Sequence, residues 1–423
     1  MSYLQKIIPL IIIQSFLSLV LFSFIYGPWP WPISDENPVF LYLIVCQLII
    51  IIGYISSKHL KQVITPGRNF KFRKNQIFIV FILSLFISFL TLYGRTGSFD
   101  LNVFNSISDL GESYGSTLDG RNAWPEYVRM LFSVSLFMFI PLGLYEFKNL
   151  NIKLKYLFVI SLFIHITIYI KMGTNKGLFD IIIFLPWIYL VSKLKKEQKI
   201  SFKNIISKSF ILSFVFLIAI TFFTQTQLER KGSVGTKAIQ NMGVGSLEAV
   251  QDKPDFFSEE YYLGYLAFTR YLTHGYYAFS QSFEIEYENT FPFGSSMFLS
   301  RKVNSLFNIK YFIENGFPGK FDEKTGWSYH QQWHSIYSWL VSDFGPFGIL
   351  ILLFILSRKL AKYWILSISG DNFLNLVKFL ILIILFFYIP ANNQIFQSPE
   401  TTVLFVTLFF FRPILSKISS SSK

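Results

Sequence analysis

Residues 39–56 read VFLYLIVCQLIIIIGYIS and contain no charged side chain. A helix of roughly 20 apolar residues crosses the hydrocarbon core of a bilayer, so this run is close to the length of one membrane span. About ten runs of this kind follow one another along the chain, and each backbone segment inside lipid must satisfy its own hydrogen bonds as a helix. The sequence therefore predicts an all-α polytopic membrane protein, with helices at Ile7–Tyr26, Val39–Ser56, Gln76–Tyr93, Val128–Leu144, Leu154–Ile170, Leu178–Ser192, Phe210–Phe223, Ser335–Leu356, Leu374–Ile389 and Thr402–Phe411.

The composition agrees with the membrane class. Of the 423 residues 52% are hydrophobic, and the mean hydropathy is +0.44, which is too apolar for a soluble chain of this size. The net charge of +13 does not indicate nucleic acid, because the Lys and Arg residues lie at the ends of the apolar runs. Cys46 is the single cysteine, which excludes an intramolecular disulfide and a cysteine metal site.

The first run, which follows Lys6, is expected to be a retained helix and not a cleaved signal peptide. It is longer than a signal-peptide core, and the sequence PWPWP at 28–32 stands where cleavage would need small residues.

The loop charges predict the orientation. Basic residues concentrate in alternate loops, around residues 58–74, 148–155, 193–208 and 358–362, and few acidic residues oppose them there. By the positive-inside rule these loops are cytoplasmic, as are both termini. The large polar insert between the seventh and eighth runs then lies outside.

This insert, Gln225–Gln332, divides the predicted architecture into helices 1–7 in residues 1–224, a large outer loop of short helices in 225–332, and helices 8–10 in 333–423. A transporter needs no such insert, whereas an enzyme that works on substrates at a membrane surface does.

Within the insert, residues 261–283 predict an amphipathic helix rich in Tyr and Phe. Arg270, His274 and Tyr277 fall on one face of it. Such a helix could lie in the headgroup layer and present Arg270 and His274 to a lipid-linked pyrophosphate. The alternative is an interfacial helix with a solvated arginine and an incidental histidine.

Two charged residues occupy unusual places. Lys176 lies in a short turn between two spans, where a cation either snorkels to the interface or faces a central cavity. Asp343 lies in the run that begins at Ser335, where a carboxylate indicates a functional or helix-pairing role. Gly345 and Pro346, which follow it, predict a broken or closely packed helix.

The outer tryptophans have two interpretations, an interfacial aromatic belt or stacking against sugar rings; they are Trp124, Trp327, Trp333 and Trp339. His330 and His334 are four residues apart but have no glutamate in a zinc-protease arrangement, so no metal site is expected. No phosphate-binding glycine loop, nucleotide fingerprint or catalytic serine motif is visible, and no cofactor is expected.

The chain resembles the bacterial O-antigen and capsule polymerases, the Wzy-type oligosaccharide repeat unit polymerases. The resemblance covers the overall architecture, with a large late periplasmic loop. Locally it rests on GTNKG at 173–177, similar to the family's Gly-Ser-Arg-Gly turn with Lys in place of Arg. It also rests on WHSIY at 333–337 running into DFGPFG at 343–348.

The resemblance implies a metal-independent glycosyltransferase with a GT-C-like fold in the bacterial inner membrane. The growing polymer on undecaprenyl pyrophosphate would be the donor, and one repeat unit on the same lipid would be the acceptor. The leaving pyrophosphate needs cations and the attacking hydroxyl needs a general base. The expected pyrophosphate-binding residues are Arg270, Arg230, Arg121 and Lys176; the expected bases are His274, then His334, then Asp343 or Glu284; the expected sugar-binding residues are Trp327, Trp333 and Tyr277.

Three alternative functions are also compatible with the sequence. An O-antigen ligase has the same architecture and donor but a lipid A core acceptor. A lipid-linked oligosaccharide flippase or transporter would spread its charges along the spans. The other GT-C branch places carboxylates in a long first outer loop, where this chain has only Asp35 and Glu36 in a short one. The sequence leaves the sugars, the linkage and a partner that sets chain length undetermined.

Overall fold

The computed structural model describes residues 2–61, 70, 72–103, 124–172, 174, 176–196, 220–224, 226, 258–329 and 334–411. Over these ranges the regular elements are all helices. The prediction of an all-α protein is confirmed for this part of the chain.

Five described helices are long and apolar enough to cross a membrane. They are α1 (Tyr3–Tyr26), α4 (Lys74–Thr96), α9 (Ile152–Lys171), α10 (Lys176–Lys195) and α17 (Ile336–Ser369). The helices α7 (Trp124–Leu131) and α8 (Ser133–Glu146) meet at 64° and would supply a sixth span if they count as one.

Three further predicted spans correspond to apolar helices of 12 to 17 residues, which are shorter than these five: α2 (Val39–Ile55), α18 (Phe373–Tyr388) and α20 (Pro399–Phe410). Most of the run Phe210–Phe223 lies outside the described residues. Among the described residues five or six spans are therefore found by length and composition, and ten stays a prediction.

Several helices begin at a polar residue that caps the first turn. Ser2 and Gln5 form a reciprocal capping box at the start of α1. The Asn151 side chain accepts a hydrogen bond from the Leu154 amide at 2.9 Å, and Ser258 accepts one from the Tyr261 amide. These caps satisfy backbone donors that the first helical turn leaves unpaired.

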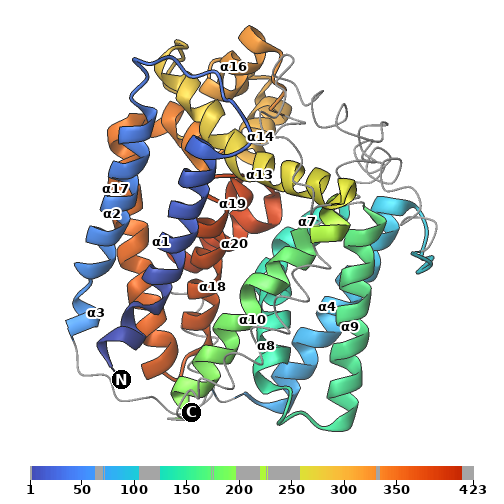
Figure 1. Cartoon of the computed structure of the whole chain (residues 1–423). Helices are drawn as coiled ribbons and strands as arrows, with labels where there is room; N and C mark the ends of the chain where they lie inside the picture. The colour runs from blue at the N-terminus through green and yellow to red at the C-terminus, as the bar shows by residue number, and fades with distance from the viewer. Residues whose placement is uncertain are drawn as a thin grey trace. The chain divides into compact units, whose positions relative to one another are not determined.

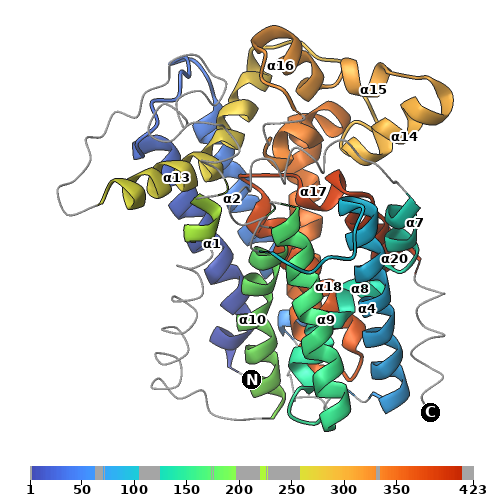
Figure 2. The same ribbon diagram turned by 90° about the vertical axis from the view of Figure 1, so that its right-hand side faces the viewer.

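The chain divides into two compact units that alternate along the sequence. The first unit comprises Met1–Ile64, Ile239–Leu366 and Ile381–Thr402, and the second comprises Thr65–Ala238, Ser367–Leu380 and Val403–Lys423. Figures 1 and 2 show the helices of both units.

In the first unit α1, α2 and α17 run side by side (Figure 1). Gly53 of α2 faces α17 so closely that a Cβ would lie 2.6 Å from the Phe354 carbonyl oxygen. The short helices of the predicted periplasmic loop gather at one end of this bundle (Figures 1 and 2); they are α13 (Glu259–Ser280), the 3-10 turn η1 (Gln281–Phe283), α14 (Met297–Phe307), α15 (Tyr311–Glu314) and α16 (Phe317–Thr325).

The predicted break in the eighth apolar run is present in α17. Gly345 has φ 63° and ψ 174°, a conformation that residues with a side chain rarely adopt, and Pro346 follows it. Beside the kink, the Tyr42 hydroxyl of α2 donates a hydrogen bond to the Pro346 carbonyl at 2.7 Å. The sequence therefore located this break correctly.

In the second unit α4 packs against α8 and α9. Phe81, Phe139 and Phe158 contact one another there, with ring centroids 5.3–5.9 Å apart. Two ion pairs lie at helix ends, Arg95 with Glu126 at 2.6 Å and Lys171 with Asp100 at 3.0 Å.

Candidate functional site

The helix α13 occupies the place where the sequence predicts an amphipathic helix, and it forms the centre of the candidate site. Its Gly275 lies against the start of α17 and the segment after α18. A Cβ on Gly275 would lie 2.7 Å from the Ser335 amide nitrogen and would overlap the Pro390 carbonyl oxygen. The Ile336 amide donates to the Ile389 carbonyl at 3.0 Å in the same place. A glycine is therefore required for this close approach.

Arg270 is buried in α13, with only 3% of its surface exposed. Its guanidinium lies 5.1 Å from the centre of the Trp29 ring. The Trp29 indole N–H in turn donates to the Leu266 carbonyl and to the Thr269 hydroxyl, both at 3.2 Å. Desolvation lowers the pKa of Arg270 to about 9, so the guanidinium stays charged at neutral pH.

The burial of Arg270 changes both interpretations of the helix. Arg270 is not the solvated arginine of a simple interfacial helix. It is also not displayed at the surface, because protein covers the charge. A cation over an indole face in a dry setting attracts an anion strongly, since little water competes for it.

His274 lies one turn along the helix from Arg270, and its Nδ1 is 2.8 Å from the Arg270 carbonyl oxygen. A carbonyl only accepts hydrogen bonds, so this contact assigns the proton to Nδ1. In the neutral ring Nε2 is then the nitrogen that accepts a proton. The ring lies nearly parallel to that of Trp327, with centroids 6.2 Å apart.

His334 is fully buried among aromatic rings, with centroids 5.6 Å from Phe321, 6.5 Å from Trp327 and 6.2 Å from Trp339. Neither ring nitrogen has a hydrogen-bond partner in the described part of the chain. Burial lowers the pKa of His334 to about 3, with a smaller effect from His274. Such a weakly basic nitrogen is a poor general base at neutral pH, so His274 is the better candidate.

The expected sugar-binding aromatics form part of the packing around these histidines. Tyr277 stacks on Trp31 with centroids 5.1 Å apart and contacts Trp327 at 5.8 Å. Trp327 has no exposed surface. The ring faces of Trp327 and Tyr277 are therefore occupied by protein in this structure, and neither is displayed to a sugar.

The two carboxylates proposed as further bases both hold loops in place. Glu284 accepts hydrogen bonds from the Ser34 hydroxyl and the Asn37 amide, each at 3.0 Å. Asp343 accepts from the Thr290 hydroxyl and from the Ser295 amide, each at 2.8 Å. These contacts give Asp343 a part in fixing the turn before α14 against α17.

The remaining expected site residues lie in the second unit or outside the described residues. Lys176 is half-buried at the start of α10, in the second unit. Arg121, Arg230, Trp333 and His330 lie outside the described residues.

Trp29 and Trp31 are the site residues that sequence reasoning missed. They belong to the segment PWPWP at 28–32, whose prolines argue against cleavage of a signal peptide. Two tryptophans fixed between prolines form a stiff aromatic segment, and this stiffness is the sequence signal that could have indicated them.

Comparison with known proteins adds no identification, because no family model, no curated protein and no solved structure matches the chain. Among the described residues, no group of three or more His, Cys, Asp or Glu could hold a metal ion. The assignment of function rests on the membrane helices and on the cluster around α13.

Proposed function

We propose that this protein polymerises oligosaccharide repeat units linked to undecaprenyl pyrophosphate, at the periplasmic face of the bacterial inner membrane. It acts as a glycosyltransferase of O-antigen or capsular polysaccharide without a metal or other cofactor. The proposal includes ten spans, cytoplasmic termini and a periplasmic insert.

The Arg270–His274 pair carries this proposal. A buried cation on an aromatic face and an imidazole with its proton assigned to Nδ1 lie one helical turn apart. A reaction with a pyrophosphate leaving group and a hydroxyl nucleophile needs these two groups, one to stabilise the departing charge and one to take the proton.

In the proposed reaction an acceptor hydroxyl oxygen bonds to the anomeric carbon of the donor. The bond from that carbon to the pyrophosphate oxygen breaks, and undecaprenyl pyrophosphate leaves with the electron pair. The hydroxyl proton passes to Nε2 of His274, and Arg270 stabilises the pyrophosphate. Because Arg270 is covered in this structure, binding of the substrate requires the covering side chains to move aside.

Deletion of the gene tests this function directly. The surface polysaccharide of the deletion strain is separated on a gel, and we expect the ladder to collapse to lipid core with a single repeat unit. Core without any repeat unit would instead indicate a ligase or a flippase, and an unchanged ladder would refute the proposal.

Complementation with variants tests the role of Arg270. We expect Arg270→Ala to abolish polymer and Arg270→Lys to retain a small part of it, because lysine keeps the charge but loses the planar donor geometry. Lys320→Ala is the control for loss of a positive charge away from the site, since Lys320 pairs with the exposed Glu323 at 3.0 Å. Immunoblots and thermal unfolding of each purified variant separate loss of function from loss of folding. Normal chains from Arg270→Ala would refute the assignment.

A further inference from the structure

The turn between α14 and α15 exposes three large apolar side chains. Leu306, Phe307 and Ile309 are 72%, 68% and 42% exposed, and together we call them the apolar tip. Asn308 lies among them in a left-handed conformation, with φ 54°, and ends α14. Single exposed apolar residues are ordinary in proteins, whereas a contiguous group of them indicates a surface that another molecule or a membrane covers.

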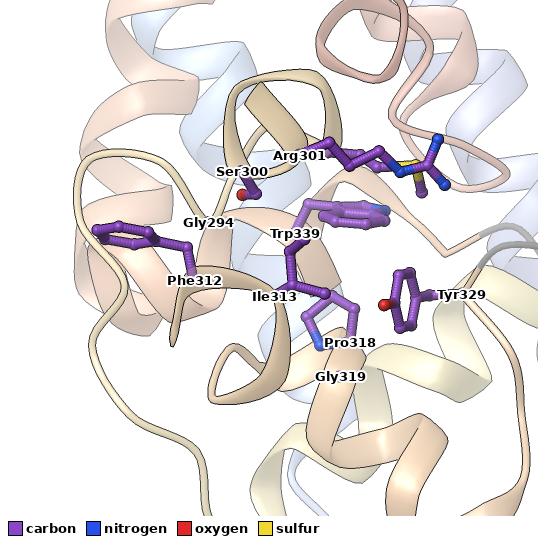
Figure 3. A pocket seen from close by; sticks show the side chains of 10 residues that line it. Gly294, Ser300, Arg301, Phe312, Ile313, Pro318, Gly319, Tyr329 and Trp339 are labelled. Carbon is purple, nitrogen blue, oxygen red and sulfur yellow. The ribbon is translucent and has the colours of Figure 1, made fainter. Parts of the chain in front are cut away.

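The side of α14 that faces the rest of the first unit is already packed. Ser300 and Arg301 line a small pocket together with Phe312 of α15 and Trp339 of α17 (Figure 3). The empty space in this pocket is about 10 Å³, which is about the room that one water molecule needs. The pocket is therefore too small to receive a side chain of the apolar tip.

A different face of α14 is apolar along its length. Leu299, Val303 and Leu306 follow one another at intervals of four and three residues, so they lie on one face of the helix. Leu299 and Val303 are partly exposed, and Leu306 is exposed. A helix of this kind can bury its apolar face in the headgroup layer of a membrane.

The exposed side of α17 shows where lipid lies relative to this turn. Phe347, Ile351 and Ile355 recur every four residues and are all exposed, Phe347 by 83%. On a helix that is long and apolar enough to cross a membrane, such a stripe is the side that faces lipid. Phe347 is the member of this stripe closest to the end of the bundle at which the short helices gather.

The apolar tip is connected to that end of the stripe through the loop before α14. Phe291 is exposed in this loop and contacts Phe344 of α17, with ring centroids 5.7 Å apart. Two residues earlier, the Asn289 carbonyl accepts a hydrogen bond from the Tyr311 hydroxyl at 3.1 Å, and Tyr311 begins α15 directly after the turn. Figure 2 shows α14 and α15 beside this end of α17. The exposed apolar residues of the turn therefore continue the surface of α17 that faces lipid.

The charges around the apolar tip complement an anionic membrane surface. Between Glu288 and Glu314 the sequence has three basic residues, Arg301, Lys302 and Lys310, and no acidic residue. Lys302 precedes the apolar tip by one helical turn, and Lys310 follows it directly. Lysine side chains at such positions reach the lipid phosphates while their apolar neighbours insert below them.

We propose that the apolar tip inserts into the bilayer beside α17, with Lys302 and Lys310 on the phosphates of anionic lipids. The contact anchors the turn between α14 and α15 to the membrane surface. The anchor goes beyond the proposed polymerase activity and does not depend on it, because it involves only the bilayer and this turn.

Site-specific fluorescence of the full-length protein in lipid nanodiscs tests the anchor. Phe307→Cys and Ile309→Cys are each labelled with the environment-sensitive fluorophore NBD. The single native cysteine, Cys46, is fully buried, so the unchanged protein is the blank for labelling. Lys324→Cys, at an exposed position of α16, reports contact with water, and Ile351→Cys, in the exposed stripe of α17, reports contact with lipid.

The nanodiscs contain phosphatidylcholine and phosphatidylglycerol, and some lipids carry a nitroxide near the headgroup. We expect these lipids to quench both labels on the apolar tip at least about twofold more than the label at position 324, and aqueous iodide to quench in the reverse order. Equal quenching by iodide at the tip and at position 324 would overturn the anchor. Shielding of the tip from both quenchers would also overturn it, because protein would then cover the tip.

A second comparison tests the two lysines. In the Phe307→Cys protein, Lys302→Gln combined with Lys310→Gln should reduce quenching by nitroxide lipids when phosphatidylglycerol is present, and not in phosphatidylcholine alone, because only anionic lipids attract the lysines. Lys324→Gln is the control for loss of an exposed charge away from the turn. Size-exclusion profiles verify that each variant is folded. An equal loss of quenching in both lipids, or no loss, would refute the contact of the lysines with anionic lipid.

Discussion

His334 allows a prediction that does not depend on the function. Its imidazole is fully buried, is surrounded by aromatic rings and has two nitrogens without partners in the described part of the chain. Replacement by phenylalanine keeps an aromatic ring of similar shape and removes both unpaired polar atoms. At pH 7.5 we therefore expect His334→Phe to be at least as stable as the unchanged protein.

The difference in stability between His334→Phe and the unchanged protein should grow as the pH falls. The pKa of His334 falls from 6.5 in the unfolded chain to about 3 in the folded protein, so the unfolded chain binds the proton more readily between these values. Proton binding by the unfolded chain therefore has no effect on stability above pH 6.5, and stability is lost progressively as the pH falls from 6.5 toward 3. At pH 5 this loss is about 2 kcal/mol.

The assay is thermal unfolding of both proteins from pH 7.5 to pH 5. The unchanged protein should lose a few degrees more than His334→Phe over this range. Because His274 also contributes to the lowered pKa of His334, the same comparison in a His274→Gln background removes its influence. Parallel pH curves for the two proteins in both backgrounds would refute the reasoning.

Two further predictions concern α13. The variant His274→Asn retains a hydrogen-bond donor near the place of Nδ1 but has no proton acceptor in place of Nε2, so we expect the rate of polymerisation to fall about 100-fold or more with folding intact. Turnover of a lipid-linked repeat unit in vitro measures this rate, and near-normal turnover contradicts the prediction. Gly275→Ala forces a methyl group against the Pro390 carbonyl and should cost about 1–3 kcal/mol of stability. Unfolding midpoints test this, with Ala278→Gly as a comparison on the same helix, and an unchanged midpoint for Gly275→Ala argues against the close approach.

Local patterns in the sequence predicted the features that depend on local chemistry. The helix at 261–283 follows from the spacing of its aromatic and polar residues, and the break in α17 follows from Gly345 and Pro346. Both are decided by the preferences of neighbouring residues in the chain.

The contacts of the site could not be predicted in this way. Trp327 and Tyr277 looked available for sugars, but which rings are covered depends on segments far away in the sequence. Trp29 reaches the backbone of α13 across 237 residues, and no periodicity within either segment encodes that pairing.

The distance in sequence between Trp29 and α13 has a consequence for synthesis. At about 5–20 residues per second, roughly 12 to 50 seconds separate the emergence of the tryptophans from that of their partner Leu266. During this interval the PWPWP segment has no α13 to cover it. The nascent chain therefore completes this part of its first unit late, and a chain interrupted before residue 266 leaves two large aromatic side chains exposed to quality-control proteases.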